Sequence, residues 1–294
     1  MPPAAQPTRQ PFVLDEEAAT AVFVLPDSDG AFDPDHAAYL RALGKRRASV
    51  LLAFPPKCAG TFLRAAAIHA VDGQLTRIVH AQGGRDATPY LPVYIRYLAL
   101  NYPKAPLVTH AHMQALPANR HFIEALDLKP AIMLRSVPDM LVSYLDMLAA
   151  KSVGASQWLN IAIPQRFEML GDEAKADFLI DTMLSWYASY YATWLDYARV
   201  APERVCVLRY GDFKADTGAV LQTVLAHSGF AVDEDMCELA VAAAWHTRHE
   251  NRFNKGTEGR GRIRFTPSQL KRIAHMLFDY YGLEAWRAEL LPGG

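Results

Sequence analysis

Four short apolar runs are the feature of this sequence that most constrains its fold. They occupy residues 48–54, 105–109, 130–134 and 204–208. Stretches with helical patterns stand between them. Short apolar runs that alternate with helices are typical of a parallel sheet, because each strand of such a sheet is buried on both faces by the helices. We therefore predict one α/β domain with a central parallel sheet flanked by helices.

The segments between these runs predict the helices and loops of the domain. Helical patterns cover residues 33–47, 61–71, 137–150, 177–199, 217–228, 233–245 and 266–281, and the Gly- and Arg-rich residues 247–265 predict a loop. Asp33 and Thr266 stand at N-cap positions, each followed by proline, and Gly282 ends the last helix. Residues 1–32 are weakly patterned. We expect an irregular N-terminal extension there, with residues 33–294 forming the domain.

Composition and charge exclude several classes of protein. Of the 294 residues 51% are hydrophobic, which is enough for a sizeable core, and the formal net charge of -1 argues against general nucleic-acid binding. Three widely spaced cysteines form neither a disulfide framework nor a zinc motif, and they suit a reducing compartment. No apolar stretch reaches the ~20 residues of a membrane helix. The start of the chain lacks the pattern of a secretory signal. We expect a cytoplasmic protein without a transmembrane segment.

The segment after the first apolar run has the composition of an anion-binding loop. Residues 54–63 read Phe-Pro-Pro-Lys-Cys-Ala-Gly-Thr-Phe-Leu. Backbone N–H groups at a helix N-terminus bind anions, and small residues let the anion approach. Lys57 adds a positive charge and Thr61 a hydroxyl donor. The order differs from the G-x-x-x-x-G-K-[ST] of ATP and GTP sites, because the lysine precedes the single glycine. A plain strand-to-helix turn with a surface lysine is the alternative.

This loop resembles the 5′-phosphosulfate loop of sulfotransferases that use 3′-phosphoadenylyl sulfate (PAPS), whose pattern is P-K-[ST]-[GA]-[TG]-T-[WF]-L. The resemblance implies a P-loop-like sulfotransferase fold and places Phe62 at the adenine-stacking aromatic. Cys58 stands where the family has a small hydroxyl residue, which weakens or removes one side-chain hydrogen bond. The loop residues that the resemblance assigns to PAPS binding are Lys57, Cys58, Ala59, Gly60, Thr61 and Phe62.

A second phosphate site is predicted after the third apolar run. Arg135 ends that run, and Ser143 lies about two helical turns further on. A guanidinium with a nearby hydroxyl suits a terminal phosphate, although Arg135 could instead pair with Asp139. The segment from Leu134 to Tyr144 resembles the family's 3′-phosphate motif, L-R-[DN]-P-x-D-x-x-V-S-[YF]. The spacing from arginine to serine is preserved, and the proline is displaced by one position.

Glycines and basic residues alternate in the loop predicted near the C-terminus. A solvated surface loop is the plain interpretation. The segment also resembles the family's nucleotide-covering loop, R-K-G-x-x-G-x-x-[KR]-x-x-F-T, which implies that Lys255 and Gly256 contact the 3′-phosphate. Asn254 replaces the family arginine at that phosphate, so Arg252 or Arg260 would have to substitute for it.

Two histidines end the second apolar run, in Val-Thr-His-Ala-His. In the family this strand ends in K-T-H, with the catalytic base at the histidine. Alignment from Pro106 places His112 on the base and His110 on the lysine, and a shift by two residues exchanges them. Residues two apart in a strand point to the same face, so both could reach the site. A buried structural histidine is the alternative for His110.

The resemblance extends in order over residues 48–270 and implies a PAPS-dependent sulfotransferase. His112 would deprotonate the hydroxyl of a small-molecule, lipid or glycan acceptor, and Lys57 would assist the departure of adenosine 3′,5′-bisphosphate. Tyr210 would face the adenine. We expect no metal and no nucleic-acid partner. Two alternatives stay open: an ATP-dependent small-molecule kinase, which predicts Mg²⁺ dependence, and a non-catalytic nucleotide-binding module, which predicts binding without turnover.

Overall fold

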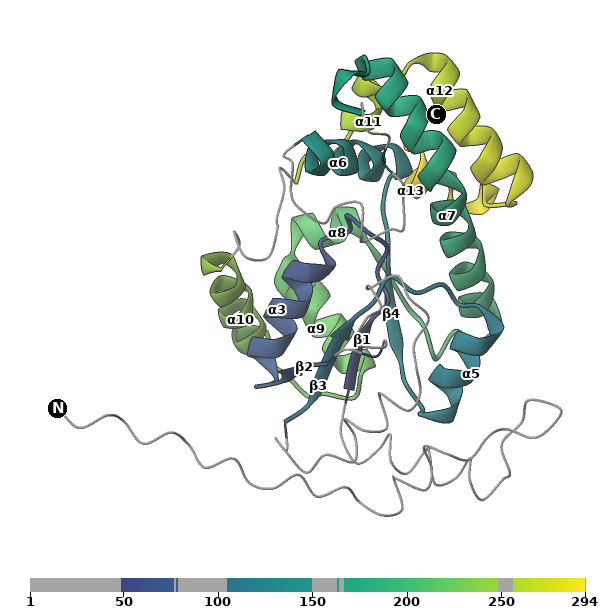
Figure 1. The fold of residues 1–294 in the computed structure, drawn as a ribbon. Helices are drawn as coiled ribbons and strands as arrows, with labels where there is room; N and C mark the ends of the chain where they lie inside the picture. The colour runs from purple at the N-terminus through teal and green to yellow at the C-terminus, as the bar shows by residue number, and fades with distance from the viewer. Residues whose placement is uncertain are drawn as a thin grey trace.

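A five-stranded parallel sheet lies at the centre of the computed structural model (Figure 1). The structure describes residues 49–76, 78, 105–149, 163, 167–247 and 256–293. The strands are β1 (Ser49–Leu52), β2 (Gln74–Leu75), β3 (Leu107–His110), β4 (Pro130–Leu134) and β5 (Cys206–Arg209). Their order across the sheet is β2-β3-β1-β4-β5, and every pair is parallel. The predicted fold class is confirmed.

The order of the strands decides where a ligand can bind. β1 is central, with Leu52 opposite His110 of β3 and Leu51 opposite Pro130 of β4. The chain adds β3 on one side of β1 and then crosses to add β4 on the other. In an open parallel sheet, the crevice at such a switch point lies outside the carboxyl ends of the strands. The segments that follow β1, β3 and β4 therefore meet at one edge.

Helices cover the two faces of the sheet (Figure 1). On one face α3 (Gly60–Ala70), α9 (Thr217–His227) and α10 (Glu234–His246) pack against one another. On the other side lie α5 (Pro117–Ala125) and the long α7 (Asp172–Val200). α6 (Val137–Ala149) follows β4 over the carboxyl edge and packs against α7. The remaining elements are η2 (Phe167–Met169), α8 (Tyr210–Ala215), α11 (Arg260–Arg264), α12 (Pro267–Ala274), a π-helical turn η3 (His275–Tyr280), η4 (Glu284–Trp286) and α13 (Arg287–Leu290).

The sequence pattern misplaced several elements. α7 begins at Asp172, earlier than predicted. Two acidic residues in its first turn stabilise this end of the helix, because they interact favourably with the positive end of the helix dipole. The prediction of a loop over residues 247–265 was wrong for α11, which packs against α6. Gly282, at φ +68°, ends the π-helical turn as predicted, but η4 and α13 follow it. α5 and α8 were not predicted.

Some predictions lie outside the described residues. These are the N-terminal extension, the helix at residues 33–47, and the two site residues Asn254 and Lys255. Within the part of the chain that the structure describes, no helix is long and apolar enough to cross a bilayer. The same residues contain no group of three or more His, Cys, Asp or Glu side chains arranged to hold a metal ion.

Gly261 lies where α11 touches α6, and we predict that it has no room for a side chain. A Cβ there would lie 2.2 Å from Pro138 Cβ and 2.9 Å from the backbone N of Asp139. Gly261→Ala is expected to lower the free energy of unfolding by about 1–3 kcal/mol, because backbone would have to shift. Urea denaturation measures this. Gly211→Ala is the matched control, since its Cβ would meet nothing within 4 Å. Equal stability of the two variants would contradict this packing.

Candidate functional site

The loop between β1 and α3 has the backbone shape of an anion cradle. Lys57 (φ 68°) and Ala59 (φ 59°) both lie in the left-handed region, which non-glycine residues rarely adopt. Such turns direct successive N–H groups into a concavity that binds anions. Ala59 is the N-cap of α3 and provides no side-chain hydrogen bond to the first turn. Strained residues of this kind cost about 1–3 kcal/mol each and cluster at functional sites.

The loop's only charged side chain is that of Lys57. Its Nζ lies 3.8 Å from Met147 Sδ, along α6. The thiol of Cys58 is buried in the core, with Sγ 3.2 Å from Met140 Sδ, also on α6. Burial raises the pKa of Cys58 to about 12, against the opposing effect of Arg135, so the thiol is neutral at neutral pH. Cys58 can therefore offer a ligand its backbone but not its side chain.

Both predicted histidines lie at this loop. His110 ends β3, and its imidazole fits against Gly60, where an added Cβ would be 2.3 Å from Nε2. His112 Nδ1 lies 2.7 Å from the carbonyl oxygen of Phe54. A carbonyl oxygen only accepts, so Nδ1 carries the proton, and Nε2 of neutral His112 keeps its lone pair. The two rings are perpendicular, with centroids 4.8 Å apart, and both side chains are buried.

Arg135 joins the same group from the end of β4. Its Nη1 donates to the carbonyl oxygen of Lys57, and its guanidinium carbon lies 3.9 Å from the centroid of the Tyr210 ring. Its Nε is buried and has no hydrogen-bond partner among the described residues. A buried donor of this kind normally has a partner. The arrangement therefore leaves one directed N–H group beside the anion cradle for a ligand.

Comparison with known proteins identifies the family. The family model for the sulfotransferase domain matches residues 49–277. The chain belongs to the sulfotransferase family. The solved structure of mouse sulfotransferase SULT7A1 complexed with PAP has 14% sequence identity, covers 85% of this chain and 90% of that one, and gives a TM-score of 0.54. A sulfotransferase from Alicyclobacillus acidocaldarius has 15% identity, coverage of 82% and 98%, and a TM-score of 0.43. No curated protein sequence matches significantly.

The family match confirms the predicted resemblance, and the matched range contains every predicted site residue of this sulfotransferase, from Lys57 to Gly256. The structure brings together the loop after β1, the two histidines and Arg135. Ser143 is buried on α6. Gly256, at φ 63°, begins the described part of the C-terminal segment.

An interaction that the sequence pattern did not indicate anchors this C-terminal segment of the sulfotransferase. Asp139, in the first turn of α6, accepts hydrogen bonds from the backbone N of Gly259 (2.8 Å) and of Gly261 (2.7 Å). Arg260 Nη2 forms an ion pair with Asp146 Oδ2 at 2.7 Å. Asp139 thus binds glycine backbone in place of the ion pair with Arg135 that the sequence left open. Its buried charge is satisfied by two directed donors.

A row of aromatic rings lies beside the loop. Phe62 packs against Trp245 at 4.9 Å and Phe213 at 6.1 Å between centroids, and Phe213 lies 5.7 Å from Tyr210. Phe62 and Tyr210 are buried, whereas Trp245 is 37% exposed. Trp245 is therefore the ring of this row that offers open surface. Its position at the end of α10, just before the basic segment, is the sequence signal that could have identified it.

The contact between Gly60 and His110 leads to a prediction about activity. Gly60→Ala places a Cβ where the His110 imidazole now lies, so that ring must move. We expect kcat to fall by up to about 100-fold, because small displacements of reacting groups have effects of this size. Gly211→Ala, on an open surface of α8, should keep the wild-type kcat. Normal kinetics of Gly60→Ala would mean that the position of His110 has no influence on the reaction.

Proposed function

We propose that this sulfotransferase-family protein transfers the sulfuryl group of PAPS to a hydroxyl of a small-molecule, lipid or glycan acceptor. One observation carries the proposal. An anion cradle with Lys57, a guanidinium with an unused buried donor, and two imidazoles meet at one edge of the sheet. Two separate anion-binding groups suit a nucleotide that carries phosphate at both its 5′ and 3′ positions. ATP has no 3′-phosphate and would not use the second group.

The described residues fit such a nucleotide. Lys57, Thr61 and the backbone of residues 58–62 would hold the 5′-phosphosulfate, with the left-handed residues of the loop providing the cradle. Arg135, through Nε, would bind the 3′-phosphate. The family resemblance assigns four further residues to the 3′-phosphate and its covering loop: Ser143, Asn254, Lys255 and Gly256. Asn254 stands in place of the family arginine.

The aromatic row provides a place for adenine. Phe62 and Tyr210 would form its floor, as the sequence predicts, and the open face of Trp245 would contact the base. The guanidinium of Arg135 lies on Tyr210 and so links this row to the proposed 3′-phosphate site. The mouse sulfotransferase SULT7A1 was solved in complex with PAP, the adenosine 3′,5′-bisphosphate that PAPS would leave behind, and this agrees with the assignment.

The chemistry is an in-line displacement at sulfur. The acceptor oxygen forms a bond to sulfur while the bond from sulfur to the 5′-phosphate oxygen breaks, and the bonding electrons go to the phosphate. His112 Nε2, which keeps its lone pair, takes the acceptor's proton. The ammonium of Lys57 stabilises the negative charge on the departing phosphate. The imidazole of His110, against the first residue of α3, can donate a hydrogen bond to the same anion.

The proposal is tested by turnover of labelled PAPS against phenols, aliphatic alcohols, sterols and sugars. We expect transfer to at least one of these classes without added Mg²⁺, and PAP binding that is tighter than ATP binding. Phosphoryl transfer from ATP that requires Mg²⁺ would favour a kinase. Tight PAP binding without transfer to any acceptor would favour a non-catalytic nucleotide-binding module.

A cytoplasmic location belongs to the same proposal. It agrees with the three cysteines, which are free thiols, because such thiols suit a reducing compartment.

A further inference from the structure

We propose that the aromatic face of α7 is a positioning element for catalysis. Four of its side chains would set the relative placement of the three segments that carry Lys57, His112 and Arg135. The inference rests on the proposed function and deepens it, because it assigns a role to residues that contact no substrate. The four residues are Tyr187, Tyr190, Tyr191 and Trp194.

These four side chains form one buried face of the helix. Their spacing of three, four and seven residues places them on the same side of α7. All four are 0% exposed. Burial alone would make them ordinary core residues. What distinguishes them is that each polar tip forms a hydrogen bond with backbone at the carboxyl edge of the sheet.

The hydrogen bonds reach all three site segments. On the β1 segment, Tyr187 Oη donates to the carbonyl of Pro56 at 3.3 Å, and Tyr190 Oη donates to the carbonyl of Ala53. On the β3 segment, Trp194 Nε1 donates to the carbonyl of Met113 at 2.7 Å. On the β4 segment, Tyr191 Oη donates to the carbonyl of Met133 at 3.2 Å and accepts from the backbone N of Arg135 at 3.2 Å.

Each contacted backbone group stands next to a group that would act on the substrate. Pro56 directly precedes Lys57. Ala53 directly precedes Phe54, whose carbonyl holds the His112 ring. Met113 directly follows His112, and Tyr191 holds the backbone of Arg135 itself. The relative positions of lysine, imidazole and guanidinium are thus coupled through one helix.

The physical reason lies in the way a parallel sheet ends. Past the last paired residues, strands diverge and their backbone groups lose their ladder partners. These ends are buried in this protein, so each backbone group needs another partner. Tyrosine and tryptophan suit this task, because a large apolar ring fills the core while its tip makes one hydrogen bond. A loop held only by apolar contacts would have a less sharply defined position.

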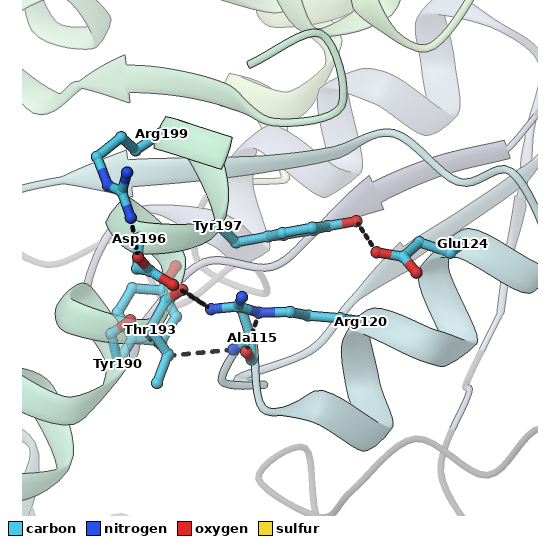
Figure 2. Close-up of polar contacts among 8 residues, drawn as sticks. All are labelled: Ala115, Arg120, Glu124, Tyr190, Thr193, Asp196, Tyr197 and Arg199. Carbon is cyan, nitrogen blue, oxygen red and sulfur yellow. Dashed lines mark hydrogen bonds and ion pairs between the residues drawn. The ribbon is translucent and has the colours of Figure 1, made fainter. Parts of the chain in front are cut away.

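The same helix holds the β3 segment a second time, as Figure 2 shows. Thr193 Oγ1 accepts from the backbone N of Ala115 at 3.2 Å. Arg120 donates to the carbonyl of Ala115 at 2.7 Å and to the carbonyl of Thr193 at 3.0 Å, and it pairs with Asp196 at 3.0 Å. Further along α7, Tyr197 Oη donates to Glu124 of α5 at 3.0 Å. Tyr197 is buried, and its hydroxyl bonds to α5 rather than to backbone of a site segment, so deletion of this hydroxyl is the matched control.

The test compares three hydroxyl deletions. Tyr191→Phe is expected to raise the Kd for PAP by about 5- to 100-fold, because a buried backbone group beside Arg135 loses its partner. Tyr190→Phe is expected to lower kcat by a similar factor with little change in the KM for PAPS. The lost hydroxyl holds the carbonyl of Ala53, next to Phe54, whose carbonyl positions the His112 ring. Tyr197→Phe should leave both constants at their wild-type values.

Thermal melting of the three variants separates positioning from stability. If Tyr190→Phe and Tyr191→Phe lower Tm no more than Tyr197→Phe does and still change the constants as expected, the positioning role is supported. If all three variants lower Tm equally and keep wild-type kcat and Kd, these side chains contribute only to core packing and the inference is overturned.

Turnover by the wild-type protein is the separate check on the proposed function. A wild type without turnover whose PAP affinity still depends on Tyr191 would reject the transfer reaction but keep the positioning role.

Discussion

His112→Ala is expected to lower kcat by about 10²- to 10⁴-fold, the range that a positioned general base contributes. The change removes the imidazole whose Nε2 keeps its lone pair because Nδ1 donates to the carbonyl of Phe54. The KM for PAPS should change little, since His112 acts on the acceptor. Steady-state kinetics with an acceptor found in the turnover screen measure both constants.

Two controls make this prediction specific. His275→Ala removes an exposed imidazole that pairs with Asp279 on η3, and it should leave kcat unchanged. His110→Ala tests the other member of the histidine pair. A normal rate for His112→Ala together with a large loss for His110→Ala would transfer the role of base to His110. Normal rates for both variants would remove the histidines from the mechanism.

Arg135→Met is expected to raise the Kd for PAP by about 30- to 1000-fold. Truncating one partner of a buried charge pair costs about 2–4 kcal/mol, which corresponds to that range. Methionine keeps much of the volume over Tyr210 but removes the guanidinium and its buried Nε. Arg135→Lys should recover little of the affinity. One ammonium cannot bond the carbonyl of Lys57, lie flat on the Tyr210 ring and reach a phosphate together.

ATP and a surface variant serve as controls for Arg135. ATP lacks the 3′-phosphate, so its weaker binding should change little in Arg135→Met. Arg199→Met removes an arginine whose side chain is 74% exposed, and it should leave PAP affinity unchanged. Titration calorimetry measures each affinity, and circular dichroism checks that the variants fold. Unchanged PAP affinity of a folded Arg135→Met protein would contradict a phosphate site at this residue.

The predicted elements that came out right share a physical basis. β1, β3, β4 and β5 each overlap a short apolar run, and the central strands need such residues because helices cover both faces of the sheet. Local signals at the ends of helices were also reliable. Thr266 caps α12 through a capping box with Gln269. These features depend on neighbours within a few positions, which the sequence displays directly.

The features that the sequence did not predict depend on contacts between segments that are distant in the chain. α11 exists in a stretch rich in glycine because Asp139 holds its start, more than a hundred positions away in the chain. Trp245 became a site candidate only when α10 was packed beside α3, which places its ring on Phe62. In the sequence the tyrosines of α7 have the pattern of ordinary core residues, and only the structure places their hydroxyl groups at the ends of two strands, β1 and β4.

The sequence by itself determined the parallel α/β class, the loop with its lysine before a single glycine, and the pair of histidines at a strand end. Each of these follows from residue order within one segment. Only the tertiary structure decided that β1 lies between β3 and β4 and that Lys57 and Ala59 adopt left-handed backbone conformations. It also decided that Arg135 lies on Tyr210 with one donor that has no partner among the described residues. The reason is physical: these properties arise from contacts between segments that are distant in the chain, and their energies appear only when the segments are packed together.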